Sequence, residues 1–308
     1  MHIFIAVFLF LVSLNSQPVF ADIGQDMTSE FVKIKFLNSD SLVKGKSNSV
    51  YDIALDKAGR IYVAEYRKNK VMVLDKDLKY IYSIDNISTP HGITVDQKGF
   101  FYVATYKNNR IRKFDLNGKE VLGWDKKLIK EQRIHSPLSL VVDQKNNLFI
   151  ADYGLKTIIK VDSNGGFLTT FNTANITTGE MLPHSIITDG KSYVYVADRS
   201  DNKAIHRFSL DGEYLETWLS PSQEFDPIAL NFLDHKLILV SNYKNSALHL
   251  FDLKGQHLLV LGRQGDQPGE FLYATGIAVD ERNHAYIAEE DGNRIQEIDL
   301  SEIASGFK

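Results

Sequence analysis

Short hydrophobic segments recur along most of the chain, and each alternates with turn-forming residues. The first group, VYDIALDKAGRIYVAEYRKNKVMVLD (50–75), contains three β-branched and aromatic stretches separated by Asp, Gly, Asn and Lys. Segments of this length and composition, bounded by turn residues, are typical of β-strands. The pattern therefore predicts an all-β fold.

The same pattern occurs six times. The other five copies span residues 90–115, 137–162, 183–211, 226–252 and 274–299. One polar residue after the first apolar stretch marks each copy: Asp56, Asp96, Asp143, Asp189, Asn231 and Asp280. Successive marks are 40, 47, 46, 42 and 49 residues apart, close to the period of a four-stranded propeller blade. We expect residues 22–308 to form one six-bladed β-propeller.

A fourth strand is predicted after each of the first five copies, at residues 78–84, 118–124, 165–171, 212–218 and 255–262. The sixth copy lacks one, because SEIASGFK (301–308) does not have a strand pattern. The segment EFVKIKF (30–36) does, and we predict that it pairs with residues 294–299 to complete the last blade. Such closure protects a sheet edge that would otherwise be exposed.

A small residue stands at one fixed place in every second strand. Blades converge toward the axis of a propeller, so small side chains are needed where neighbouring sheets pack. These residues are Ala64, Ala104, Ala151, Ala197, Ser241 and Ala288.

The N-terminus has the pattern of a signal peptide. A twelve-residue apolar run, Ile3–Leu14, is too short to span a bilayer comfortably, and small residues follow at Val19 and Ala21. Met1-His2 lacks the usual Lys or Arg. We predict a cleaved signal peptide (1–21) and a secreted or periplasmic protein, and we find no later apolar run long enough for a membrane span.

Composition narrows the function classes. The 308 residues are 44% hydrophobic and carry 35 Lys and Arg against 39 Asp and Glu, a net charge of −4. This balance gives no overall attraction to nucleic acid, and we expect a monomer without a nucleic-acid partner. The absence of cysteine excludes disulfides, thiol nucleophiles and zinc–thiolate sites.

The repeats resemble those of the NHL-repeat family of six-bladed β-propellers. The similarity is clearest in GRQGDQPGEFLYATGIAVDERNHAYIAEEDGNRIQEID (262–299) and in the second copy. It supports the architecture but not one activity, because propellers serve as enzymes, receptors and scaffolds.

Most repeated acidic residues have a structural interpretation. The aspartates that mark the copies precede turns, where their side chains accept backbone N–H groups. Glu65, Asp152, Asp198 and Glu289 end second strands, where turn bonding and ligand contact are both open. His206 and His249 occupy equivalent third-strand positions, and strand packing accounts for them.

One end of the predicted channel has more varied chemistry. The residues assigned to the start of the first strands are Tyr51, His91, Leu138, His184, Asp226 and Thr275. The loops after the second strands add Tyr66, Tyr106, Tyr153 and Tyr243, with Arg67, Lys68, Lys107, Arg199 and Lys244 nearby. This rim predicts a site for a small anionic, sugar-like or peptide ligand, or for a protein partner. The alternative is that the tyrosines only pack between blades.

His91 and His184 share the context Pro-His-x-Ile two copies apart. This pair resembles the metal site of the peptidyl-α-hydroxyglycine α-amidating lyase family, in which three such histidines hold a catalytic zinc. The resemblance implies zinc as a cofactor here, with Tyr153 and Arg67 as catalytic candidates. Thr275 takes the third position, and His135 is a candidate replacement.

Three functions stay open: a non-catalytic binding propeller, a zinc-dependent lyase, and a lactonase-type hydrolase whose acidic residues would include Asp226, Glu65 and Asp198.

Overall fold

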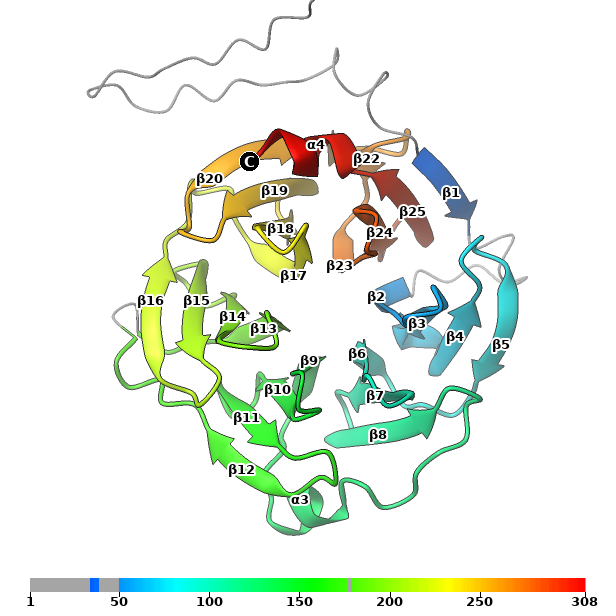
Figure 1. Ribbon diagram of the computed structural model, residues 1–308, viewed down its shortest axis with the longest axis vertical. Coiled ribbons are helices and arrows are strands. Elements are labelled where there is room, and N and C mark those ends of the chain that lie inside the picture. The colour runs from blue at the N-terminus through cyan, green and yellow to red at the C-terminus, as the bar shows by residue number, and fades with distance from the viewer. Residues whose placement is uncertain (1–33, 39–49, 177–178, 308) are drawn as a thin grey trace, which may run out of the picture.

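A computed structural model describes residues 34–38, 50–176 and 179–307 of the chain. Six antiparallel sheets stand around a central axis in sequence order, which confirms the six-bladed β-propeller (Figure 1). The predicted signal peptide and residues 30–33 lie outside the described residues. No helix in the described ranges is long and apolar enough to cross a membrane.

Each blade begins with its innermost strand. Blade one consists of β2 (Val50–Leu55), β3 (Ile61–Glu65), β4 (Lys70–Leu74) and β5 (Tyr80–Ile84). Blade two contains β6 (Pro90–Val95), β7 (Phe100–Thr105) and β8 (Arg110–Asp115). Blade three contains β9 (Pro137–Val142), β10 (Leu148–Asp152), β11 (Thr157–Val161) and β12 (Phe167–Thr170).

The remaining blades follow the same order. Blade four contains β13 (Pro183–Thr188), β14 (Tyr193–Asp198), β15 (Ala204–Ser209) and β16 (Tyr214–Trp218). Blade five contains β17 (Pro227–Leu233), β18 (Leu237–Asn242), β19 (Ala247–Asp252) and β20 (His257–Leu261). Blade six contains β23 (Ala274–Val279), β24 (His284–Glu289), β25 (Arg294–Asp299) and β1 (Ile34–Asn38). A short pair, β21 (Arg263–Gln264) and β22 (Glu270–Phe271), precedes it, and α4 (Ser301–Gly306) ends the fold.

The N-terminal strand closes the ring, as predicted. β1 pairs antiparallel with β25, from Ile34 opposite Ile298 to Asn38 opposite Arg294. The described strand extends two residues beyond the predicted segment 30–36 at its C-terminal end. The last blade is therefore built from both ends of the chain.

Blade two differs from the prediction. Residues 118–124 do not form a fourth strand. A single bridge joins Phe114 and Glu120, and the chain then turns into α3 (Lys126–Lys130). The reason lies at Asp125, whose carboxylate accepts the Ile111 amide at 3.1 Å and the Arg110 guanidinium at 2.6 and 2.8 Å. The Asp125 side chain therefore accepts a backbone N–H group of β8 to which a fourth strand would otherwise bond.

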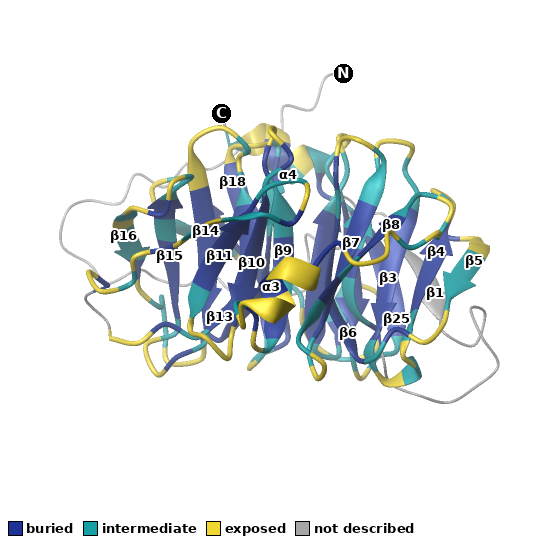
Figure 2. Ribbon diagram, turned by 90° about the horizontal axis from the view of Figure 1, so that it is seen from below, coloured by how far each residue is buried: buried dark blue, intermediate teal, exposed yellow. Residues whose placement is uncertain are grey.

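The core lies between the blades, where the strands are buried along most of their length (Figure 2). All six small second-strand residues have no measurable exposure, which confirms their packing role. Between blades one and two, for example, Tyr62 and Ala64 share a cluster with Phe101 and Phe114. The large aromatic side chains of blade two thus pack in the space beside the small side chain of Ala64 in blade one.

The repeated aspartates form turns, as predicted. Asp56 accepts the amides of Ala58 and Arg60, both at 2.9 Å. The same pattern of amides two and four residues later recurs at Asp96, Asp143, Asp189 and Asp280. These carboxylates are used by the backbone and do not form a catalytic array.

Candidate functional site

The six inner strands carry an irregularity near their start, at one end of the channel. In β2, for instance, Val50 and Asp52 pair with consecutive residues of β3, so Tyr51 lies in a bulge. The residues in the corresponding places are Tyr51, His91, Leu138, His184, Ile228 and Thr275. The prediction placed Asp226 in this set. It was two residues out of register in blade five, where Ile228 is the equivalent residue.

Tyr51 lies across the channel. Its hydroxyl is 3.2 Å from Nε2 of His184, a residue 133 positions later on the opposite blade. Its ring centroid is 3.8 Å from that of His91, and the two imidazole centroids are 6.5 Å apart. Tyr66 and Tyr106 pack on His91 at 5.3 and 5.4 Å. We call Tyr51, Tyr66, His91, Tyr106 and His184 the mouth cluster.

The protonation of the Tyr51–His184 pair follows from its neighbours. Nδ1 of His184 lies 2.8 Å from the carbonyl oxygen of Ile228, which can only accept. Neutral His184 is therefore protonated at Nδ1, and Nε2 accepts the Tyr51 hydroxyl. Burial lowers the pKa of His184 to about 4 and raises the pKa of Tyr51 above its ordinary value. Both groups are neutral at pH 7.

His91 has an unusual environment. Its side chain is 7% exposed, and its buried Nδ1 has no hydrogen-bond partner among the described residues. Burial, with a smaller effect from His184, keeps the pKa of His91 well below 6.5. Buried polar atoms in proteins are normally satisfied, so this ring nitrogen is left to pair with water or with another molecule.

Charged residues surround the mouth cluster in pairs. Arg199 donates to both oxygens of Asp226 at 2.9 and 2.6 Å, and its guanidinium lies over the Tyr243 ring at 4.9 Å. Tyr273, which the sequence analysis missed, packs on Tyr243 at 4.8 Å. Across the rim, Arg67 lies 3.4 Å from Glu290. Both Arg199 and Glu290 act electrostatically on Tyr51, so the rim and the mouth cluster form one region. Tyr273 contacts Tyr243 of blade five, and Glu290 contacts Arg67 of blade one. Both contacts depend on how neighbouring blades meet, which no local pattern in the sequence signals.

Two predicted residues do not join the cluster. Tyr153 is 36% exposed and makes no ring contact with the mouth cluster within the described part of the chain. Thr275 is buried, and its hydroxyl lies 3.5 Å from the carbonyl oxygen of Ala288 in its own blade. Neither side chain is placed to act on a group held by both histidines.

The residues present do not fit a zinc ion. A catalytic zinc usually has three protein ligands, and the described residues contain no group of three His, Cys, Asp or Glu side chains placed to hold a metal. Both nitrogens of His184 are used by protein groups. His135 packs beside Gly154, and its backbone amide donates to Asp152. We therefore derive no chemistry through a metal at this end of the channel.

The acidic residues at the ends of the second strands also serve the fold. Asp198 accepts the amides of Leu182 and Ser200 at 2.8 Å and lies 3.0 Å from Nε2 of His206. The side chains of Arg294 and Gln296 donate hydrogen bonds to Glu289. Lys68 and Lys70 form salt bridges with Glu65. In blade five, His249 lies between Asn242 and His257. These contacts agree with the structural interpretation of both the acids and the third-strand histidines.

Comparison with known proteins supports the architecture. The family model of the NHL repeat matches residues 88–114, and a family model described as a 6-bladed beta-propeller matches residues 221–304. A gluconolactonase from Xanthomonas campestris aligns with a TM-score of 0.65 at 13% identity, over 87% of this chain and 89% of that chain.

Other similar structures have different functions. Virginiamycin B lyase from Staphylococcus aureus gives a TM-score of 0.61 at 13% identity, over 87% of this chain and 99% of that chain. A chain of a nidogen/laminin complex gives 0.57 at 14% identity, over 68% and 79%. At these identities the similarity shows the fold and not the activity.

Proposed function

We propose that this chain, a six-bladed β-propeller with NHL repeats, binds a small neutral, sugar-like ligand at the mouth cluster. The orphaned Nδ1 of His91 carries the proposal, because a buried ring nitrogen without a partner costs free energy that a bound hydrogen-bonding group would recover. The aromatic rings around it offer flat apolar faces to a ring-shaped ligand.

Charge favours a neutral ligand over an anionic one. Both histidines and Tyr51 are neutral at pH 7, for the reasons given above. The Arg199 guanidinium, whose charge acts on Tyr51, is already held by both oxygens of Asp226, and Lys203 lies 3.4 Å from the same carboxylate. An anion at the mouth would therefore meet cations whose charge Asp226 already offsets.

The same pKa shifts favour binding over proton-transfer catalysis. A general acid or base works best when its pKa lies near the operating pH. In the Tyr51–His184 pair the two pKa values move apart, so the proton stays on Tyr51. The lactonase and lyase hypotheses would need a second group with a pKa nearer neutrality at this end of the channel.

Saturation-transfer NMR with three related probes tests this proposal. D-Glucose and D-glucono-1,5-lactone are neutral rings, whereas D-gluconate is an open-chain anion. We expect saturation transfer to the two rings and a shift of the His91 ring resonances, with neither effect for gluconate. His91→Phe should abolish the transfer, and His235→Asn, which removes an exposed imidazole in a turn, should leave it unchanged.

Other outcomes would change the conclusion. Lactone hydrolysis by the wild type that disappears in His91→Phe would establish the lactonase hypothesis. Transfer to gluconate alone would show an anion site, and no transfer from any probe would contradict a sugar-like ligand of this size.

Export is part of the proposal, on the strength of the signal-peptide pattern. N-terminal sequencing of the protein from its native host should begin at Asp22, and a chain that still begins at Met1 would contradict it.

A further inference from the structure

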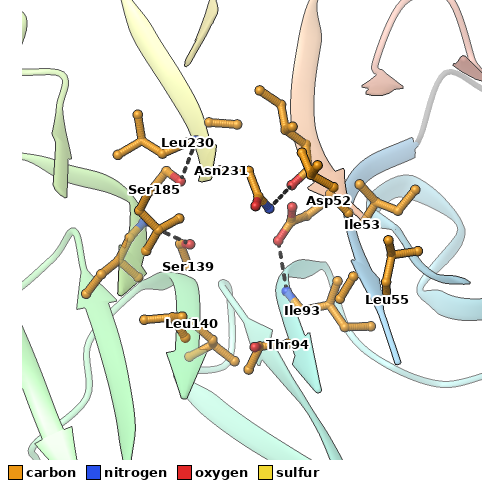
Figure 3. Close-up of a pocket in the computed structure, with 18 of the residues that line it drawn as sticks. Asp52, Ile53, Leu55, Ile93, Thr94, Ser139, Leu140, Ser185, Leu230 and Asn231 are labelled. Atoms are coloured by element: carbon orange, nitrogen blue, oxygen red, sulfur yellow. Dashed lines mark hydrogen bonds between the residues drawn. The ribbon is translucent and has the colours of Figure 1, made fainter. Parts of the chain in front are cut away.

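A second compartment lies below Tyr51, inside the ring. It has a volume of about 200 Å³ and is partly open. The inner strands of all six blades line it, for example with residues 52–55 of β2. No residue of the mouth cluster belongs to this lining. Figure 3 shows the inner-strand side chains converging on this space. Because Tyr51 lies across the channel above it, this compartment is separate from the proposed ligand site.

Asp52 places a single carboxyl group in this channel compartment. One oxygen accepts the Ile93 amide of the next blade at 2.9 Å (Figure 3). The lining contains no Lys, Arg or His, so no cation of the described lining balances the charge of Asp52. Burial raises the pKa of Asp52 to about 7, and two backbone hydrogen bonds act in the opposite direction. Asp52 therefore titrates in the neutral range, and its ionised form is a negative charge that no cation of the lining balances.

Further acceptors face the same space. The hydroxyl oxygens of Ser139 and Ser185 accept amides of the following blades at 3.3 and 3.1 Å, which leaves each a second lone pair. The Asn231 side chain donates to the carbonyl oxygen of Ile277 at 2.9 Å, so its own oxygen is turned the other way. The rest of the lining is mostly aliphatic, from alanine, valine, leucine and isoleucine side chains.

We propose that the channel compartment binds a small primary alkylammonium ion. Asp52 would supply the opposite charge and accept one ammonium hydrogen, and two of the oxygens of Ser139, Ser185 and Asn231 would accept the other two. The alkyl group would lie against the aliphatic walls and gain from leaving water.

Charge and geometry distinguish this cation from a metal ion. A single carboxylate balances one positive charge, whereas a divalent ion would keep a net positive charge inside the ring. Hard divalent cations need six to eight oxygen ligands, and the described residues show no group of three acidic or imidazole side chains here. An ammonium group requires only three acceptors, and its alkyl group suits the walls.

The experiment uses n-propylammonium chloride as the probe at pH 8, where Asp52 is mostly ionised. Sodium chloride at the same concentration controls for ionic strength, and n-propanol supplies the same alkyl group without charge. The side-chain carboxyl ¹³C resonance of Asp52 reports binding. We expect a saturable shift with propylammonium only, and an apparent pKa of Asp52 that falls as the amine concentration rises.

Three variants complete the test. Asp52→Asn keeps an acceptor for the Ile93 amide but removes the charge. This variant should bind the amine at least about tenfold more weakly, as measured by calorimetry. Ala54→Leu narrows the compartment without altering the carboxyl group, and should also abolish binding. Asp77→Asn removes an exposed charge from the same blade and should have no effect.

Each alternative outcome overturns the proposal. An equal response to sodium would show a site for any monovalent cation, and an equal response to propanol would show an apolar cavity in which Asp52 plays no part. Amine binding that survives both Asp52→Asn and Ala54→Leu would place the amine elsewhere. These results do not depend on His91, so they are separate from the test of the mouth cluster.

Discussion

The Tyr51 hydroxyl lies 3.2 Å from Nε2 of His184, and this contact joins blade one to blade four across the channel. Neighbouring blades in a propeller make most of its contacts, so a bond between opposite blades is a separate constraint on the ring. It also divides the channel into the mouth cluster on one side and the channel compartment on the other.

Replacing Tyr51 with phenylalanine tests this contact. The variant keeps the ring packed against His91 but leaves Nε2 of His184 without its donor. We expect a loss of about 1 kcal/mol in the free energy of unfolding. The pKa of His184 should rise from about 4, because the hydroxyl stabilises the neutral imidazole. Urea unfolding and NMR titration measure the two effects, with Tyr106→Phe as the matched control. An unchanged His184 titration would show that the hydrogen bond does not form in solution.

Asp52 should make stability depend on pH. Its pKa is about 7 in the folded protein and near 3.8 when unfolded, so the folded state binds the proton more tightly. The contribution of Asp52 to stability is complete below pH 3.8 and is lost as pH rises through 7. Water in the channel reduces this effect, and we expect about 1–3 kcal/mol.

The Asp52→Asn variant reveals this dependence. Relative to the wild type it should gain stability between pH 4 and pH 8, measured by urea unfolding without added amine. Asp77→Asn should follow the wild type over the same range. A constant difference between Asp52→Asn and the wild type at all pH values would contradict the raised pKa.

Removal of the N-terminal strand should open the ring. Deletion of residues 22–38 takes away the partner of β25 and leaves its edge unpaired. We expect aggregation, or a melting temperature lower by at least about 5 °C. Deletion of residues 22–33 retains β1 and serves as the control. If the two truncated proteins melt together, the pairing of β1 adds nothing to stability.

Zinc gives a further test of the mouth cluster. Because both nitrogens of His184 are engaged and Thr275 occupies the third position, the wild type should retain much less than one equivalent of zinc after gel filtration. A Tyr51→Phe, Thr275→His double variant frees one nitrogen and adds a third imidazole, and should retain more. Stoichiometric zinc in the wild type, removed by His91→Ala, would restore the zinc-dependent lyase hypothesis.

Repetition made the fold predictable. Each of the six copies has a small residue in its second strand, and five of them have an aspartate before a turn. Packing between blades and tight turns require these residues, so the pattern recurs along the chain. The fourth strand of blade two was predicted wrongly because residues 118–124 have the same apolar pattern as the true outer strands. The fourth strand does not form because the Asp125 carboxylate accepts the Ile111 amide. Strand propensity does not describe such a side-chain contact.

The site was less predictable than the fold. The variety of residues at the inner-strand starts predicted that Tyr51, His91 and His184 belong to a site, and the structure brings these three side chains together. Asp226 was assigned to the place that Ile228 occupies. The register was wrong in this copy, although Pro227 before Ile228 matches the proline before His91, Leu138 and His184 in the sequence. Asp52 was missed because a single acidic residue within an apolar strand carries no spacing signal. Only the closed ring shows that it faces a channel.

The pairing of β1 with β25 has a consequence for synthesis. Ile34 leaves the ribosome long before its partner Ile298, so blade six cannot form until nearly the whole chain is available. The earlier blades can assemble locally as they emerge, whereas the first strand must wait for the last. The ring is therefore completed only in the full-length chain, and a nascent or truncated polypeptide retains the unpaired edge of β25.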